Sequence, residues 1–380
     1  MADRADYAFM ARALHLAERG LYSADPNPRV GCVVVRDGEI VGEGWHCRAG
    51  EAHAEIHALR QAGERARGAD VYVTLEPCCH HGRTPPCSDA LIAAGLKRVV
   101  AAMDDPNPKV AGQGLAQLTR AGIAVESGVM QVEAERLNPG FIRRMRAGRP
   151  WVRCKLAMSL DGRTALANGE SRWITGNASR HDVQAWRARS SAVMTGIGTV
   201  LADDPALTVR LEPALWKQRG CAEEIRQPLR VVMDGRLRTP VSARLLKQPG
   251  RTRIITANAD PAAVQALSDA GAMVTCLSTA PDGTGVNLQE SLRFLAEERV
   301  NELWVEAGAN LSGAMLQAGL IDELIIYVAP LLMGDAARGL FHLPPFDRMA
   351  DCLDLRITDV RAVGDDWRIT ARLETAGDAL

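Results

Sequence analysis

Aromatic residues and net charge are both scarce in this 380-residue sequence. Phe, Trp and Tyr together make up 4% of the chain, and the formal net charge is −1. A surface that binds nucleic acid needs an excess of Lys and Arg, together with aromatic side chains on which bases stack. The composition therefore disfavours a nucleic-acid-binding protein, and we expect no nucleic acid among the partners.

Long apolar runs are also missing. No stretch reaches the roughly 18 apolar residues that span a bilayer. The first seven residues, MADRADY, include acidic side chains and no apolar core, unlike a signal peptide. The nine cysteines of such a chain indicate reduced thiols, some of them metal ligands, rather than a disulfide framework. We therefore expect a cytoplasmic protein that does not contact membranes.

The chain length favours two domains, and the apolar pattern divides accordingly. In the first part, apolar spacing predicts helices at 7–19, 51–66, 89–94, 113–121 and 132–145, and strands at 30–35, 40–45, 71–75 and 98–102. The segment from Gly148 to Pro150 marks a junction. We expect domains at 1–146 and 150–375, with no internal repeat between them.

The second part repeats the alternation from Trp151 onward. Strands are expected at 152–158, 192–195, 229–233, 252–256, 302–306 and 324–329, and helices at 179–190, 285–298 and 310–318. Residues 211–228 are polar and predict a loop or an insertion. Such an alternation is typical of layered α/β domains with largely parallel sheets.

One group of residues has the composition of a catalytic zinc site. His53, Cys78 and Cys87 supply three ligands, and Glu55 is a carboxylate that none of them needs. Catalytic zinc takes three protein ligands and keeps a fourth position for water, and a nearby Glu can move protons. The residue types match the H-x-E and P-C-x-x-C pattern of zinc deaminases, although the two cysteines stand further apart here.

Other interpretations of these residues stay open. Positions i and i+2 of a helix do not share a face, so His53 and Glu55 converge only if the metal lies at the helix's N-terminal end. His57 lies four residues after His53, which allows a two-histidine site, but the Glu is misplaced for the H-E-x-x-H motif. An isolated His, or a buried free Cys, is commonly structural.

The loop between the cysteines offers further ligands. Cys79, His80 and His81 compete for the metal by type, so a closed four-ligand structural zinc site is a second possibility. The run is rich in Pro, Gly and His, which is untypical of a protein core. This composition favours metal binding over burial for Cys78 and Cys87.

The second part carries weaker motifs. Gly196-Ile-Gly198 lacks the third glycine of a dinucleotide loop, because Leu201 occupies that position. The run from Glu306 to Ala314 places glycines between an expected strand and an expected helix, where free backbone N–H groups suit a phosphate. The same glycines would also fit a tight strand–helix turn without a ligand.

Several runs together resemble the family of bifunctional riboflavin-biosynthesis deaminase/reductases over most of the chain. The runs similar to the deaminase half are Ala24–Pro28, Val30-Gly31, His53–Glu55, Glu76–Cys78, Gly82–Cys87 and Asp105–Gly112. Those similar to the reductase half are Lys155–Ala165, Gly169–Thr175, Thr199–Arg210, Val305–Gly308 and Asp322–Leu324. The resemblance implies an α/β protein with an N-terminal cytidine-deaminase-like three-layer domain and a C-terminal dihydrofolate-reductase-like domain.

For the first domain, the resemblance implies one Zn²⁺ per chain on His53, Cys78 and Cys87, with Glu55 as the catalytic proton donor. The implied substrate is a small phosphorylated pyrimidine, 2,5-diamino-6-ribosylamino-4(3H)-pyrimidinone 5′-phosphate. Asn27 and the His80-His81 loop would contact it. Cys79 departs from the small polar residue that is usual at its position.

For the second domain, the resemblance implies NADPH as cofactor. The residues implied to line the cofactor are Ala157, Trp173, Thr199, Asp203, Gly235, Gly308, Ala309, Asn310, Leu311, Ser312, Gly313 and Ala314. Those implied to line the substrate are Ser171, Arg187, Leu207, Arg210 and Glu306.

The chemistry of these residue types agrees with such roles. Arg187 and Arg210 can clamp a sugar phosphate, because guanidinium matches phosphate oxygens in a fork. Trp173 offers a flat apolar wall to a nicotinamide. Without the resemblance, however, the arginines would be solvated, Trp173 would be a core residue, Asp203 a turn cap and Glu306 a strand-end carboxylate.

We therefore expect a two-step enzyme that deaminates the pyrimidinone and then reduces its ribosyl group to ribityl with NADPH. The alternatives are a nucleic-acid or nucleoside deaminase, and a zinc-stabilised binding protein without catalysis. Because apolar helices of such domains often pair, we also expect a homo-oligomer.

Overall fold

A computed structural model of the chain describes residues 3–80, 85–211 and 225–373. The chain divides between Arg149 and Pro150 into two compact units, each described below by itself. His81, the run from Gly82 to Thr84 and most of the expected insertion at 211–228 lie outside the described residues. The described cysteines are all free thiols. No described helix is long and apolar enough to cross a membrane.

The first unit is built on a five-stranded sheet in the order β2-β1-β3-β4-β5. Its strands are β1 (Gly31–Arg36), β2 (Glu39–Trp45), β3 (Asp70–Val73), β4 (Arg98–Ala101) and β5 (Ala124–Ser127). The sheet is parallel from β3 to β5. Strand β1 pairs antiparallel with β2, as the Asp-Gly turn indicates, and also with β3, where a parallel pairing was expected. The β1–β2 hairpin turns through Asp37 and Gly38, whose φ angles of 52° and 80° fit a tight two-residue turn.

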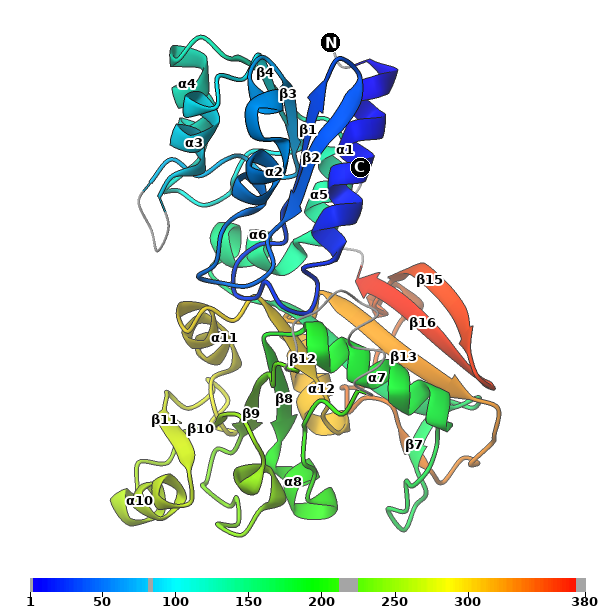
Figure 1. Cartoon of the computed structure of the whole chain (residues 1–380). Coiled ribbons are helices and arrows are strands. Elements are labelled where there is room, and N and C mark those ends of the chain that lie inside the picture. Colours follow the sequence, from blue (N-terminus) through cyan, green and yellow to red (C-terminus); the bar gives the residue numbers. More distant parts are fainter. Residues whose placement is uncertain (1–2, 81–84, 212–224, 374–380) are drawn as a thin grey trace. The chain divides into compact units, whose positions relative to one another are not determined.

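Helices cover both faces of this sheet, giving three layers (Figure 1). The helices are α1 (Arg4–Glu18), α2 (Ala54–Ala62), α3 (Cys87–Ala93), α4 (Gln113–Arg120), α5 (Gln131–Leu137) and α6 (Pro139–Ala147), with a 3₁₀ turn at Gly63–Ala66. Along β1, Val34 faces the cluster formed with α2, α3 and α4, and Val33 faces the cluster formed with α1, α5 and α6. Burial on both faces explains the continuous apolar runs of the central strands.

Two helix predictions in this unit are wrong in their bounds. The helix predicted at 51–66 begins only at Ala54, and its last turn is 3₁₀. The helix predicted at 132–145 is two helices, because Pro139 cannot continue α5 and instead begins α6.

The second unit is built on a nine-stranded sheet in the order β11-β10-β9-β8-β12-β6-β13-β16-β15. Its strands are β6 (Trp151–Ser159), β8 (Ala192–Gly196), β9 (Leu229–Met233), β10 (Thr252–Thr256), β11 (Ala272–Cys276), β12 (Glu302–Val305), β13 (Glu323–Ala329), β15 (Leu355–Val363) and β16 (Asp366–Leu373). The pairings from β11 to β13 are all parallel, and β16 and β15 are added antiparallel. A separate pair joins β7 (Arg163–Ala165) to β14 (Arg338–Gly339).

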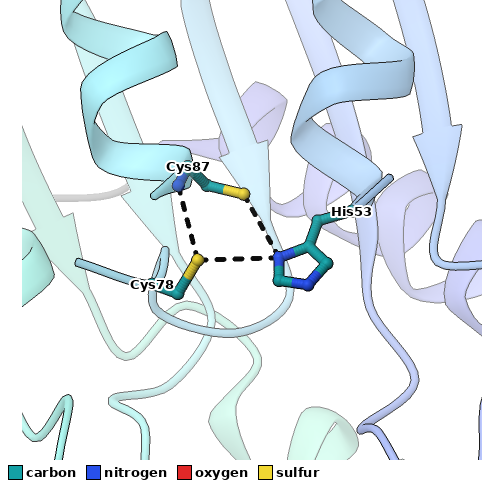
Figure 2. A group of neighbouring side chains, drawn as sticks. All are labelled: His53, Cys78 and Cys87. Carbon is teal, nitrogen blue, oxygen red and sulfur yellow. Dashed lines mark hydrogen bonds between the residues drawn. The ribbon is translucent and has the colours of Figure 1, made fainter. Parts of the chain in front are cut away.

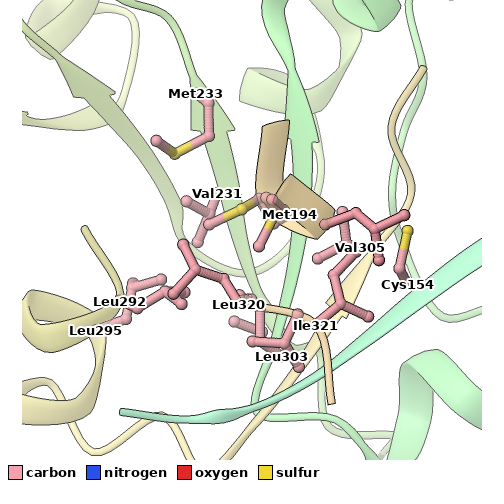
Figure 3. Close-up of a cluster of buried hydrophobic side chains, with 14 of the residues drawn as sticks. Cys154, Met194, Val231, Met233, Leu292, Leu295, Leu303, Val305, Leu320 and Ile321 are labelled. Atoms are coloured by element: carbon pink, nitrogen blue, oxygen red, sulfur yellow. The ribbon is translucent and has the colours of Figure 1, made fainter. Parts of the chain in front are cut away.

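The helices of this unit follow individual strands. They are α7 (Asn177–Arg189), α8 (Ile197–Asp203), α10 (Pro261–Asp269), α11 (Leu288–Glu297) and α12 (Ala309–Gln317), with 3₁₀ turns at Arg244–Lys247 and Met349–Asp351. The main core lies between the sheet and α11 and α12, where Met194, Val231 and Leu303 meet Leu292 and Leu295 (Figure 3). The opposite face packs against α7, α8 and α10.

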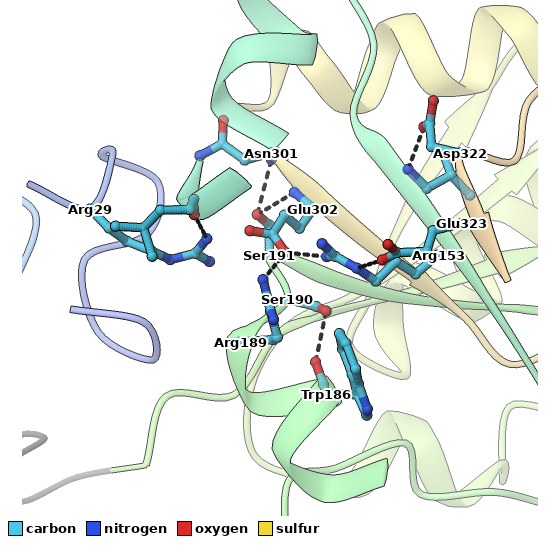
Figure 4. A network of polar contacts seen from close by, with 12 residues as sticks. Arg29, Arg153, Trp186, Arg189, Ser190, Ser191, Asn301, Glu302, Asp322 and Glu323 are labelled. Atoms are coloured by element: carbon cyan, nitrogen blue, oxygen red, sulfur yellow. Dashed lines mark hydrogen bonds and ion pairs between the residues drawn. The ribbon is translucent and has the colours of Figure 1, made fainter. Parts of the chain in front are cut away.

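A buried ionic network joins the central strands of this sheet (Figure 4). Arg153 on β6 donates to Glu323 on β13 at 2.6 Å and also to Glu302 on β12. All three residues are buried. Because a buried charge is tolerated only when paired, this network favours one strand order over others.

In the first unit, a buried carboxylate ties α1 to the sheet. Asp6 accepts hydrogen bonds from the Tyr72 hydroxyl at 2.6 Å and from two Arg98 nitrogens at 2.8 and 3.0 Å. Arg98 is the main reason that the pKa of Asp6 lies well below its ordinary value. The ionised carboxylate therefore stabilises the native fold.

We expect Asp6→Asn to lower the free energy of unfolding at neutral pH by about 2–3 kcal/mol, because it removes a charged hydrogen-bond acceptor from Arg98. Since the native pKa is depressed, the contribution is complete above the ordinary Asp value of about 4 and is lost as pH falls below it. Urea unfolding at several pH values measures this. Glu18→Gln, on an exposed side chain of the same helix, is the control. A difference between wild type and variant that persists undiminished in strong acid would contradict the assignment.

Candidate functional site

The structure brings His53, Cys78 and Cys87 together from three segments (Figure 2). His53 is the N-cap of α2, Cys87 is the first residue of α3, and Cys78 lies in the loop after β3. His53 Nδ1 is 3.6 Å from Cys78 Sγ and 3.3 Å from Cys87 Sγ. The cluster therefore lies at the N-terminal end of α2, the only position from which His53 and Glu55 can converge.

These separations fit a tetrahedral zinc ion. Bonds of about 2.3 Å to sulfur and about 2.0 Å to nitrogen place the two ligand atoms about 3.5 Å apart. Within the described part of the chain, no other group of three His, Cys, Asp or Glu side chains converges in this way. His57, Cys79 and His80 are not part of the group, so the structure does not assemble the two-histidine alternative. His81 lies outside the described residues.

Glu55 is buried beside the cluster. It is the second residue of α2 and is 3% exposed. Its Oε2 has no hydrogen-bond partner in the described structure. Burial raises the pKa of this carboxyl, against the opposing effect of His53. A buried carboxyl with an uncommitted oxygen and a raised pKa is suited to accept and return a proton.

The two thiols of the cluster differ in pKa. A hydrogen bond from Cys87, assisted by His53 and by the Cys87 backbone N–H at 3.4 Å, lowers the pKa of Cys78 to about 4. The same hydrogen bond, together with burial, raises the pKa of Cys87. The N-terminal end of α3 thus faces a thiolate, the form of cysteine that binds metals.

Close packing fixes the start of α2. A Cβ on Gly44 of β2 would lie 2.3 Å from the carbonyl oxygen of Ala54, so only glycine allows the helix to approach the sheet this closely.

The residues before the helix also have a polar anchor, since His46 Nδ1 lies 3.2 Å from the Ala52 carbonyl. His46 contacts His53 edge-on and lies 3.1 Å from the Asn27 amide. Burial lowers the pKa of His46 to about 4, so it is a neutral positioning group.

Glu76, just before the Pro77-Cys78 pair, anchors the other side of the site. Its two oxygens accept hydrogen bonds from the backbone N–H groups of Asp105, Gly112, Gly114 and Leu115 at 2.9 to 3.3 Å. The carboxylate therefore caps α4 from a distant segment and holds it against the Cys78 loop. The sequence did not predict that Glu76 and His46 would position the segments of the site, because the partners of Glu76 are far away in sequence and those of His46 lie in loops without a motif.

In the second unit, strand order defines where a ligand can bind. After β6 the chain passes to β8 and continues outward through β9, β10 and β11, whereas β12 returns between β8 and β6. Parallel sheets bind ligands outside the carboxyl ends of their strands, where the strand order reverses. Here that edge is formed by the ends of β6, β8 and β12, and α8 and α12 begin there.

Most of the predicted cofactor residues lie at or near this edge. Ala157 lies on β6, Thr199 and Asp203 lie in α8, Gly235 follows β9, and the 308–314 run begins at Gly308, the N-cap of α12. No atom lies within 4 Å of a Cβ built on Gly308, so the space above the helix start is open. Gly196-Ile-Gly198 also lies at a strand-to-helix turn, despite the failed motif.

Trp173 is not the core residue expected without the resemblance. Its side chain is 70% exposed, and the Arg180 guanidinium lies 4.5 Å from its ring. Its exposed neighbour Arg172 donates to Asp203 at 3.0 Å, which connects the 171–173 segment with α8. Ser171 is likewise exposed.

The two arginines of the predicted phosphate clamp lie in different environments. Arg187 is neither solvated nor free: it is buried, binds both oxygens of Glu306 at 2.5 and 2.8 Å, and donates to the Thr208 carbonyl at 2.9 Å. Arg210 is exposed, and partial burial together with the charge of Arg187 lowers its pKa, so the clamp formed by the two arginines stays a prediction. Leu207 is buried in a cluster with Trp304.

Glu306, the acidic partner of Arg187, is an ionised carboxylate. Burial opposes its charge, but Arg187, with Lys155 and the Trp304 indole N–H at 2.8 Å, lowers its pKa to about 2. Lys155 was missed as a site residue. The signal was that Lys155 is one of two charged residues in a largely apolar strand, and burial lowers the pKa of its amine.

Comparison with known proteins gives the same division of the chain. Residues 3–103 match the cytidine and deoxycytidylate deaminase zinc-binding region, and residues 150–369 match the RibD C-terminal domain. Riboflavin biosynthesis protein RibD of Escherichia coli is 52% identical over 372 residues, covering 95% of this chain and 97% of that protein. The Haemophilus influenzae protein of the same name is 48% identical, with 96% of each chain covered.

Solved structures agree over the full length. RibD of Acinetobacter baumannii has a TM-score of 0.90 at 47% identity, covering 98% of this chain and 99% of that one. A Thermotoga maritima diaminohydroxyphosphoribosylaminopyrimidine deaminase/5-amino-6-(5-phosphoribosylamino)uracil reductase has a TM-score of 0.82 at 31% identity, covering 97% and 99%. The predicted fold class is confirmed in both halves.

We expect Cys78→Ser to reduce bound zinc sharply and Cys79→Ser to leave it unchanged, because only Cys78 lies in the cluster. The zinc content of dialysed protein and the thiolate-to-metal charge-transfer band of the Co²⁺-substituted protein report this. Equal loss in both variants would show that the two adjacent cysteines exchange as ligands.

Proposed function

This chain belongs to the RibD family of bifunctional deaminase/reductases of riboflavin biosynthesis, and we propose that its first unit carries out the deamination and its second unit the reduction. The observation that carries the proposal is the three-ligand cluster with buried, uncommitted Glu55 beside it. The proposed substrate is 2,5-diamino-6-ribosylamino-4(3H)-pyrimidinone 5′-phosphate. The name of the Thermotoga maritima relative, which gives it as a deaminase of a diaminohydroxyphosphoribosylaminopyrimidine, supports this choice.

In the first unit, His53, Cys78 and Cys87 would hold Zn²⁺. When bound, zinc lowers the pKa of a water molecule to about 7 and so supplies a nucleophile at neutral pH. Glu55 takes up a proton on its unpaired oxygen and returns it to the amino group that leaves as ammonia. The donor set of two thiols and one imidazole, without a fourth ligand in the described cluster, supports a catalytic rather than a closed structural site.

In the second unit, the carboxyl edge of the sheet would hold NADPH, which supplies the hydride when bound. The free N–H groups at the start of α12 face the open space at Gly308 and suit the pyrophosphate. Ala157, Thr199 and Asp203 would line the remainder of the cofactor. Hydride transfer to the ribosyl group produces the ribityl chain.

The substrate would bind next to the cofactor along the same edge. Arg210 would bind the sugar phosphate, and Ser171 and Leu207 would line the site. Arg187 orients Glu306 through their two hydrogen bonds, and Glu306 would then present a fixed negative charge to substrate hydroxyl or N–H groups.

We also propose a cytoplasmic homo-oligomer. Strand β15 lies at the edge of the nine-stranded sheet and exposes Leu355, Ile357 and Val360. An exposed apolar edge strand of this length is commonly paired in soluble proteins.

We expect Glu55→Gln to keep zinc but to lower ammonia release by about 10²–10⁴-fold, the usual contribution of a general acid–base group. Metal content and ammonia release are measured on the same samples. Glu51→Gln, the same change at an exposed position before α2, should have little effect. Near-normal turnover of Glu55→Gln would refute the assigned role.

Substitutions of two glycines, Gly308 at the N-cap of α12 and Gly313 within it, separate cofactor binding from stability. Gly308→Asn should preserve stability, because Asn is a favourable N-cap, but its amide should occupy the helix N–H groups and raise the KM for NADPH about tenfold or more. Gly313→Ala should instead destabilise the unit, since its Cβ would lie 2.3 Å from the His342 carbonyl oxygen. Thermal unfolding and NADPH kinetics separate the two. An unchanged KM in Gly308→Asn would argue against a phosphate at this helix end.

A further inference from the structure

The segment from Asp234 to Thr239 follows β9 at the carboxyl edge of the second sheet. Strand β9 is the direct neighbour of β8, whose end leads into α8, and β8 is the neighbour of β12, whose end leads into α12. Neighbouring strands are about 4.8 Å apart, so the β9 end lies about 10 Å along the edge from the start of α12. The adenosine half of a dinucleotide with its pyrophosphate at α12 can extend over this distance.

The acidic residue of this segment is not available to a ligand. Asp234 is completely buried, and its Oδ2 accepts from both the backbone N–H and the hydroxyl of Thr239 at 2.7 Å. In dinucleotide sites, an acidic side chain near the adenosine ribose binds the 2′-hydroxyl of NAD, whereas an Arg nearby accommodates the 2′-phosphate of NADP. Asp234 holds the segment's shape instead, which removes it as a partner for a ribose hydroxyl.

The basic residues of the same segment are uncommitted. Arg236 and Arg238 are both exposed, and neither guanidinium has a hydrogen bond or ion pair with any residue that the structure describes. Two other exposed arginines of this unit are paired: Arg348 with Asp351, and Arg361 with Asp359.

The backbone that carries these two arginines is held in place. Asp234 N–H donates to the Ile255 carbonyl of β10 at 2.9 Å, and Leu237 N–H donates to the Asp234 carbonyl at 3.3 Å. A Cβ on Gly235 would lie 2.9 Å from the Gly285 Cα, so the segment packs closely against its neighbour. The turn thus fixes the backbone of both arginines, and guanidiniums bind phosphate oxygens through charge-assisted hydrogen bonds.

We propose that Arg236 and Arg238 bind the 2′-phosphate of NADPH and make the reductase selective for NADPH over NADH. The inference rests on the proposed function, because it extends the cofactor site of the second unit. It assigns the choice between the two nicotinamide cofactors to residues that contact neither the nicotinamide nor the substrate.

The test compares the full-length wild type with Arg236→Ala, Arg238→Ala and the double variant. The double variant should raise the KM for NADPH by about 10- to 100-fold, as expected for lost charged hydrogen bonds to phosphate, with kcat at saturation unchanged. The KM for NADH and the rate of ammonia release should not change. Arg251→Ala removes one positive charge, as each single variant does, from an exposed residue just before β10 and should leave all four quantities unchanged.

Binding of two fragments provides a readout that does not require turnover. Wild type should bind 2′,5′-ADP more tightly than 5′-AMP, and the double variant should bind them equally. Equal loss of NADPH and NADH, or an unchanged preference for 2′,5′-ADP in the double variant, would overturn the inference while leaving the reductase assignment intact. Failure of wild type to oxidise either cofactor in the presence of the deaminated substrate would instead overturn the proposed function.

Discussion

The first site depends on one geometric constraint: two helices and one loop must deliver a nitrogen and two sulfurs to a single point. The helices α2 and α3 begin at this point, and their first residues supply His53 and Cys87. This arrangement has two consequences. It places Glu55 in the first turn of α2, facing the cluster although it is only two residues from His53, and it directs the N-terminal end of α3 at the Cys78 thiolate. The supporting contacts of Gly44, His46 and Glu76 all act on the segments that meet there.

In the second unit, helix N-terminal ends also gather at one place. Strands end and helices begin along one edge, so backbone N–H groups and strand-end side chains collect where the strand order reverses. The Arg187–Glu306 pair is built into this edge and is buried. It therefore holds two opposite charges in a defined orientation at this edge.

Much of this could be predicted from the sequence. The strands buried on both faces are continuous apolar runs, and every strand predicted in the second half is present within one or two residues. The zinc-type ligands were identifiable because their residue types are rare in combination. By contrast, no element was predicted at β5, β11, β15, β16, α8 or α10. Of these, β15 is exposed and α8 is short, so neither has an apolar face with a clear period. The pairing of Arg187 with Glu306, 119 residues later, has no local signal, and the exposure of Trp173 depends on tertiary structure alone.

The most direct measurement is X-ray absorption spectroscopy at the zinc edge of the full-length, zinc-loaded protein. The account predicts two sulfurs at about 2.3 Å, one imidazole nitrogen at about 2.0 Å and one further light atom that is not an imidazole. Three sulfurs with one imidazole, or two sulfurs with two imidazoles, would show a site closed by four protein side chains. Such a result would contradict a catalytic metal centre in which Glu55 moves the proton.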